Sequence, residues 1–178
     1  MTKIAVEEGV IFEGDKIVEI LRWENLSSKF DFLAELSSKF SDNEKPILVG
    51  GSAVELYTRG ISRSIDLDLI DEASVLVPLL LKLGFKKEGR HFHKSGVYVE
   101  ILSKKLSGKS NIVRYKDAKI RVISVEDLIV DRLCACNFCN SVYDCEQARM
   151  LVSAYKKRLN VNYIKEGVAS CGGISIEF

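Results

Sequence analysis

The chain has 178 residues, with 26 basic and 25 acidic side chains and a formal charge of +1. This balance excludes a bulk field that would draw the protein to nucleic acid or to an anionic membrane. No apolar run approaches the roughly 18 residues of a membrane span, and the first residues lack the apolar stretch of a signal peptide. We therefore expect a cytoplasmic protein with no membrane partner.

The first third of the chain predicts helices followed by a strand. Apolar side chains between residues 16 and 40 recur at helical spacing, which predicts one or two helices. A polar turn at 41–46 separates them from Ile47–Val49, a short apolar strand typical of the middle of a sheet. A helix over 53–57 should follow, opened by Ser52 as its N-cap.

The middle of the chain alternates between strand and helix patterns. Its period falls to two residues beyond Phe85, which is typical of hairpins. The expected elements are a strand at 64–70, a helix at 73–83, a hairpin with its turn at 90–96 and a strand at 97–102, and a second hairpin from 112–115 and 119–122.

The last third predicts helices only. Residues 124–127, Ser-Val-Glu-Asp, resemble a capping box that opens a helix to about Cys136, and one or two helices fill 142–169. The predicted fold class is α/β (α+β), a mixed sheet flanked by helices with a helical C-terminal tail. We divide it into an N-terminal helical segment at 1–45, a core at 46–123 and a C-terminal helical region at 124–178, together one compact unit.

Two features of the core carry chemistry. Asp66 and Asp68 alternate along one strand, so their side chains share a face with alpha-carbons roughly 6.6 Å apart and can share a pair of divalent ions. The Gly50-Gly51-Ser52 turn precedes a helix, so it offers backbone N–H groups and the positive end of a helix dipole to a phosphate. A metal site and a phosphate site are therefore expected within one short unit.

These residues carry a resemblance to a known family. A Gly-Gly-Ser turn followed by Asp66-Leu67-Asp68 resembles the signature of the DNA polymerase beta-type nucleotidyltransferase superfamily. Within it the chain looks most similar to small nucleotidyltransferase-like proteins, including some related to toxin-antitoxin systems. Their stretch of arginine, threonine and two aspartates is matched from Arg63 to Asp68 with serine for threonine, and their third acid is matched by Glu100. The likeness spans residues 46–133.

The resemblance implies transfer of a nucleoside monophosphate from a nucleoside triphosphate to an acceptor. Asp66, Asp68 and Glu100 would hold two Mg²⁺ ions, or Mn²⁺ in their place, and Glu100 would help to deprotonate the attacking hydroxyl. The nucleotide would be bound by the turn and by a nearby cation, namely Gly50, Gly51, Ser52 and Arg63. Arg63 either adds charge at the triphosphate or braces the turn.

The acceptor and the wider role stay open. A protein hydroxyl, a tRNA end and a small molecule all suit the chemistry, and an antitoxin-like partner would fit a toxin. A different class is a catalytically silent nucleotide-binding or protein-interaction module of the same fold. Three clustered carboxylates argue against it, because holding like charges together is unfavourable.

The cysteines and histidines admit several interpretations. Cys134, Cys136, Cys139 and Cys145 are either buried thiols, which is the default for a cytosolic protein, or metal ligands, or disulfide partners. A third class of function, a cysteine-based metal or redox protein, would rest on them. His91 and His93 share one face of the presumed hairpin and are expected to be surface residues, because a metal or acid–base role needs partners.

Overall fold

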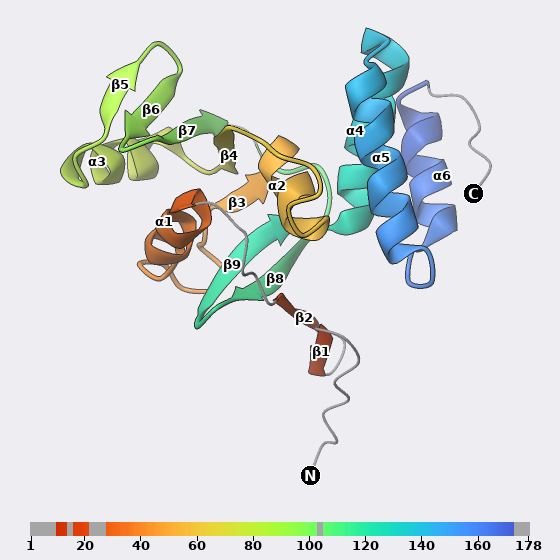
Figure 1. Ribbon diagram of the computed structural model, residues 1–178, viewed down its shortest axis with the longest axis horizontal. Coiled ribbons are helices and arrows are strands. Elements are labelled where there is room, and N and C mark those ends of the chain that lie inside the picture. Colours follow the sequence, from red (N-terminus) through yellow and green to blue (C-terminus); the bar gives the residue numbers. More distant parts are fainter. Residues whose placement is uncertain (1–9, 14–15, 22–27, 103–104, 173–178) are drawn as a thin grey trace.

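The computed structural model describes residues 10–13, 16–21, 28–102 and 105–172, the first two ranges by their backbone alone. Within these residues, nine strands form one mixed sheet in the order β1-β2-β8-β9-β3-β4-β7-β6-β5 (Figure 1). The strands are β1 (Val10–Glu13), β2 (Lys16–Leu21), β3 (Ile47–Val49), β4 (Asp66–Ile70), β5 (Lys86–Glu88), β6 (His91–Lys94), β7 (Val97–Leu102), β8 (Ser110–Tyr115) and β9 (Ala118–Ile123).

Helices flank the sheet and then gather at one end of it. They are α1 (Ser28–Ser37), α2 (Gly50–Tyr57), α3 (Ala73–Lys82), α4 (Val125–Cys139), α5 (Val142–Tyr155) and α6 (Val161–Ser170). The helix α1 contacts β9 and β7, α2 contacts β3 and β4, and α3 contacts β7. The last three helices stand side by side, and α4 and α5 contact α2 (Figure 1).

Aspartate and leucine alternate along β4, so one face of the strand packs into the core and the other displays the candidate site. Leu67 and Leu69 are fully buried, whereas Asp66 and Asp68, which alternate with them, are only half-buried. Because successive side chains of a strand point to opposite faces, the leucines enter the core and the aspartates lie on the other face. Burial of each leucine stabilises the fold by roughly 2 kcal/mol, which fixes the register that displays the acids.

Most of the expected elements are confirmed. The strand at 47–49 is central, with β9 parallel on one side and β4 antiparallel on the other. The second hairpin is formed by β8 and β9, and the C-terminal third is helical as expected. Ser124 caps α4 by accepting a hydrogen bond from the backbone N–H of Asp127.

Three expectations were wrong. The helix expected from residue 16 is the strand β2, a run rich in β-branched side chains that pairs with β1 and β8. The turn expected at 90–96 contains the strand β6, because the turn itself is only Ser95 and Gly96, both at positive φ. The helix α2 begins at Gly50 with Val49 as its N-cap, so Ser52 lies inside its first turn.

No helix of the described ranges is long and apolar enough to cross a membrane. The division of the chain at residues 45 and 123 stays a prediction.

Candidate active site

The three predicted acids lie on one face of two neighbouring strands. The strands β4 and β7 are parallel, and Asp66 pairs with Tyr98 while Asp68 pairs with Glu100. Residues paired across a ladder share a face of the sheet, with strands about 4.8 Å apart. The sheet therefore brings Glu100 beside both aspartates, although 32 residues of sequence separate it from Asp68.

A histidine completes this group from a third strand. In the antiparallel pair of β6 and β7, His91 lies opposite Glu100. Its Nε2 atom is 3.5 Å from Oε2 of Glu100 and 3.8 Å from Oδ2 of Asp66. One donor atom from each of Asp66, His91 and Glu100 lies within 4.8 Å of the other two. His91 is 32% exposed, and its acidic partners come from strands distant in sequence, so the sequence alone did not indicate them.

Asp68 lies on the other side of the acid group, against the glycine turn. Burial, and after it the charges of Asp66 and Glu100, raise the pKa of Asp68 to about 6. Such a carboxylate is held in its ionised form most readily by a cation bound beside it.

Gly50 provides the space that Asp68 occupies. It has φ +64, and a Cβ atom placed on it would come within 2.2 Å of Oδ2 of Asp68. Only glycine tolerates the positive φ and also leaves room for the carboxylate, so the Asp68 side chain can pack directly against the backbone of the turn. The neighbouring Gly51 is similarly tight, since a Cβ atom there would lie 2.9 Å from Oγ of Ser64.

Ser52 has a different place from the one expected. Its side chain is fully buried, and its hydroxyl donates to the backbone oxygen of Asp66 and accepts from Nζ of Lys29 at 2.8 Å. The hydroxyl thus ties α2 to the start of β4 and is turned away from solvent. A phosphate at the turn would meet backbone N–H groups and not this hydroxyl.

A buried ion pair, which no sequence pattern predicts, supports this contact between α2 and the start of β4. Lys29 on α1 and Glu55 on α2 are 4% and 1% exposed, with 2.6 Å between Nζ and Oε2. Lys29 also donates to the backbone oxygen of Ser64, and Glu55 accepts from the backbone N–H of Ser64. The pair fixes the chain that enters β4, and therefore the position of Asp66.

Arg63 belongs to the same network. Its Nη1 is 3.5 Å from Oε1 of Glu55, and its backbone oxygen accepts a hydrogen bond from Tyr143 on α5. Of the two roles expected for Arg63, these contacts correspond to bracing the turn.

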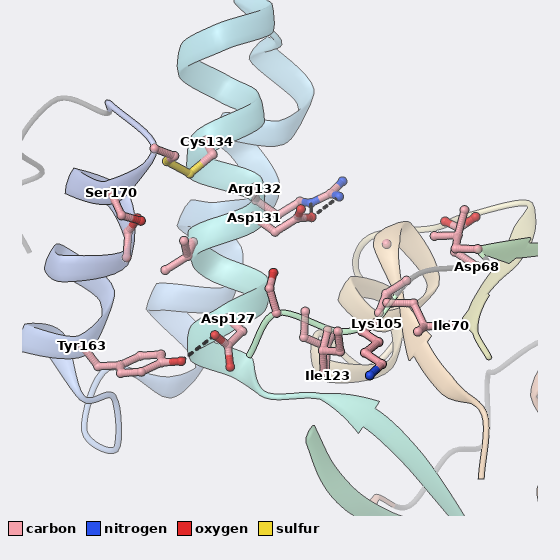
Figure 2. A pocket seen from close by; sticks show the side chains of 18 of the residues that line it. Asp68, Ile70, Lys105, Ile123, Asp127, Asp131, Arg132, Cys134, Tyr163 and Ser170 are labelled. Atoms are coloured by element: carbon pink, nitrogen blue, oxygen red, sulfur yellow. Dashed lines mark hydrogen bonds and ion pairs between the residues drawn. A yellow bond between two sulfur atoms is a disulfide. The ribbon is translucent and has the colours of Figure 1, made fainter. Parts of the chain in front are cut away.

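A cavity of about 650 Å³ opens beside Asp68, between the sheet and the C-terminal helices (Figure 2). Gly50 and Asp68 line one wall, and Arg132 of α4 lines another. Arg132 is held by Asp131 at 2.5 Å and by Asp144 at 2.8 Å, and its charge lowers the pKa of Asp68. Arg132 and Lys105 are the basic side chains of the lining. Neither was predicted, because Arg132 reaches the site through the packing of α4, and Lys105 lies in the segment between β7 and β8, outside every motif of the sequence.

Of the three interpretations that the sequence left open for the cysteines, the structure shows disulfides for four of the five. Cys134 pairs with Cys171, which joins α4 to the end of α6, and Cys136 pairs with Cys145, which joins α4 to α5. Cys139 is free and exposed. Cys171 lies far from the cysteine cluster in sequence, so its spacing gave no sign of the pairing.

No family model and no curated protein matches the sequence, but solved structures do match the fold. An antigenic nucleotidyltransferase-like protein from Paracoccidioides brasiliensis has a TM-score of 0.59 at 16% identity, covering 80% of this chain and 86% of that chain. The antibiotic-resistance factor ANT(2'')-Ia has a TM-score of 0.55 at 12% identity, covering 80% of this chain and 89% of that chain. The chain has a nucleotidyltransferase fold. The expected fold class is confirmed.

The donor set of the site suits a divalent cation. Asp66, Asp68 and Glu100 offer the carboxylate oxygens that Mg²⁺ and Mn²⁺ prefer, and the two aspartates remain accessible from the cavity side or from solvent. Burial is the main cause of the raised pKa of Asp68, and the charges of Asp66 and Glu100 add to it, so a bound cation would favour the ionised carboxylate.

Proposed function

We propose that this protein is a nucleotidyltransferase that depends on a divalent metal ion. The observation that carries the proposal is the convergence of Asp66, Asp68 and Glu100 on one face of β4 and β7, next to a glycine turn. The folds of the matching structures support the same general reaction.

Each part of the site has a role in that reaction. The backbone N–H groups of Gly50 and Gly51, at the start of α2, bind the outer phosphates of a nucleoside triphosphate. Asp66, Asp68 and Glu100 would hold the metal ions, which would supply charge neutralisation for the transfer. Lys105 places positive charge on the cavity wall, where it would offset the negative charge of the nucleotide, whereas Arg132 on the same wall is paired with Asp131 and Asp144.

The acceptor attacks the alpha phosphorus in line. A bond forms between its oxygen and the phosphorus, the bond to the bridging oxygen breaks, and pyrophosphate leaves with the electron pair. Glu100 receives the proton of the attacking hydroxyl. The acceptor is a protein hydroxyl, a tRNA end or a small molecule, and an antitoxin-like partner would restrain such an activity in a toxin.

A labelling experiment tests the proposal. Protein is incubated with labelled ATP, CTP, GTP or UTP, Mg²⁺ and total cellular RNA and protein. We expect label transfer that falls by at least ~100-fold in Asp66→Asn/Asp68→Asn, because the variant loses several kcal/mol of charge stabilisation. The matched control is Asp71→Asn/Glu72→Gln, which removes two carboxylates just beyond the end of β4 and should transfer normally.

The outcomes separate the two candidate functions. Equal transfer by the wild type and Asp66→Asn/Asp68→Asn would place the activity elsewhere. Absence of transfer from every protein would favour the silent nucleotide-binding or protein-interaction module.

A further inference from the structure

His91 stands where a metal ligand would stand. It reaches the acid group from β6, while Glu100 comes from β7 and Asp66 from β4, three adjacent strands of the sheet. Strand pairing holds all three backbones in place, so the donors converge without the help of a loop. This is the rigid support that a binding site needs.

The spacing of the donors suits one ion. Two ligands of a divalent ion with bonds of about 2.1 Å can lie up to about 4.2 Å apart. The Nε2 atom of His91 lies 3.5 Å from Glu100 and 3.8 Å from Asp66, within that reach. Both separations exceed the 2.7–3.2 Å of an N–H···O hydrogen bond, so direct hydrogen bonds do not account for the arrangement.

A cation can reach the site from solvent, and the arginine beside the acids can move away from it. His91, Asp66 and Glu100 are 32%, 30% and 16% exposed, so an ion can enter from solvent. Arg90 lies 3.3 Å from Glu100 but is 74% exposed, so its long side chain can move into water when a cation arrives.

His93 provides a contrast on the same strand. It lies on the same face as His91 and is similarly exposed, but its Nε2 atom is 3.4 Å from Glu88 and its ring stacks on Tyr98. The metal-competent cluster found among the described residues includes His91 and not His93. The difference arises because only His91 is paired with Glu100.

We propose that Nε2 of His91 binds, together with Asp66 and Glu100, one of the divalent ions of the site. Imidazole favours later transition metals over Mg²⁺, so the site should select Co²⁺, Ni²⁺ or Zn²⁺ more strongly than three carboxylates would. This inference rests on the proposed function for its catalytic meaning, but it concerns metal binding and is tested without turnover.

Pulsed electron paramagnetic resonance on untagged protein loaded with Mn²⁺ tests the ligand directly. A bound imidazole nitrogen modulates the spin echo, and the chain has only two histidines to supply one. We expect nitrogen modulation in the wild type and in His93→Gln, and its loss in His91→Gln. Thermal unfolding without metal verifies that both variants are folded.

Metal titration gives the second measurement. Affinity for Co²⁺ should fall at least ~10-fold in His91→Gln. Loss of a residue that only hydrogen-bonds to a metal ligand already lowers metal affinity by about that much, and loss of a ligand itself should cost no less. Affinity for Mg²⁺ should change less, and His93→Gln should match the wild type.

The possible failures are distinguishable. Bound Mn²⁺ without nitrogen modulation, or modulation that persists in His91→Gln, overturns the role of His91 and leaves the proposed transfer reaction standing. Absence of Mn²⁺ binding to the wild type overturns both. Nitrogen modulation in a protein that transfers no label supports the metal site and counts against the enzyme.

Discussion

The surroundings of Asp68 disfavour its ionised form. Its pKa is raised to about 6, first by burial and then by Asp66 and Glu100. The unfolded chain releases this proton near pH 3.8. Between about pH 4 and pH 6 the folded state therefore binds more protons than the unfolded state, so the free energy of unfolding falls as the pH rises through that range and stays low above it.

Replacing Asp68 by asparagine should consequently stabilise the metal-free protein. We expect Asp68→Asn to gain about 1–2 kcal/mol at pH 7.5, less than the raised pKa alone implies because solvent screens a partly exposed group. The gain should shrink toward zero at pH 4. Urea unfolding in the presence of a chelator measures both values.

Asp42 gives a control of opposite sign. A hydrogen bond from Lys119 lowers its pKa, so Asp42→Asn should not stabilise the protein at any pH. Equal stability of Asp68→Asn and the wild type at pH 7.5 would contradict a raised pKa of Asp68 in the folded state.

At the scale of single residues, the sequence predicts what depends on local pattern. Asp66, Asp68 and Gly50 were found because their spacing is short. The pairing of His91 with Glu100 is also encoded locally: a two-residue turn at Ser95-Gly96 pairs 94 with 97, and counting back pairs 91 with 100. The burial of the Ser52 hydroxyl depends on Lys29, which no pattern places beneath it.

At the scale of elements, α1 is anchored to α2 by the buried pair of Lys29 and Glu55. Lys29→Met should lower the free energy of unfolding by about 3 kcal/mol, because it leaves the Glu55 carboxylate buried with fewer partners. Chemical denaturation measures the loss, and Lys29→Met/Glu55→Leu should recover part of it.

An exposed pair nearby gives the comparison. Lys39 lies 3.8 Å from Glu35, and these side chains are 38% and 64% exposed. Lys39→Met should therefore change the free energy of unfolding by less than about 1 kcal/mol. Similar losses in the two lysine variants would mean that burial adds nothing to the first pair.

Elements were predictable where one period dominated the sequence. The alternation of β4 and the capping box before α4 were clear because neighbouring residues decide them. The strand β2 was mistaken for helix because the four Ile, Val and Leu side chains among its six residues fit both periods, and only its pairing with β1 and β8 decides between them.

At the scale of the whole molecule, two disulfides join the C-terminal helices. The bond between Cys134 and Cys171 closes 37 residues, and that between Cys136 and Cys145 closes 9. Chain entropy then predicts that changing Cys134 and Cys171 to serine lowers the free energy of unfolding by about 4 kcal/mol. The same change at Cys136 and Cys145 should lower it by about 2.5 kcal/mol, because the loop is shorter. Guanidinium unfolding of the two double variants, both in a Cys139→Ser background, measures the order.

The opposite order, or no loss in either variant, would show that packing of α4 against α5 and α6 already fixes the bundle. Since Cys134 and Cys171 both line the cavity, the first variant should also reveal whether α6 must stay docked for a nucleotide to bind. Nucleotide affinity of the oxidised and reduced wild type gives the same information without mutation.

The sheet order places β6 and β5 outside β7, at one margin of the molecule. A marginal hairpin can be lengthened, trimmed or exchanged while the ladder between β4 and β7 stays whole. The carboxylates and the imidazole thus reside on separable pieces of chain. Remodelling of this one hairpin during evolution can therefore change the metal preference of the site, while the acids stay in register.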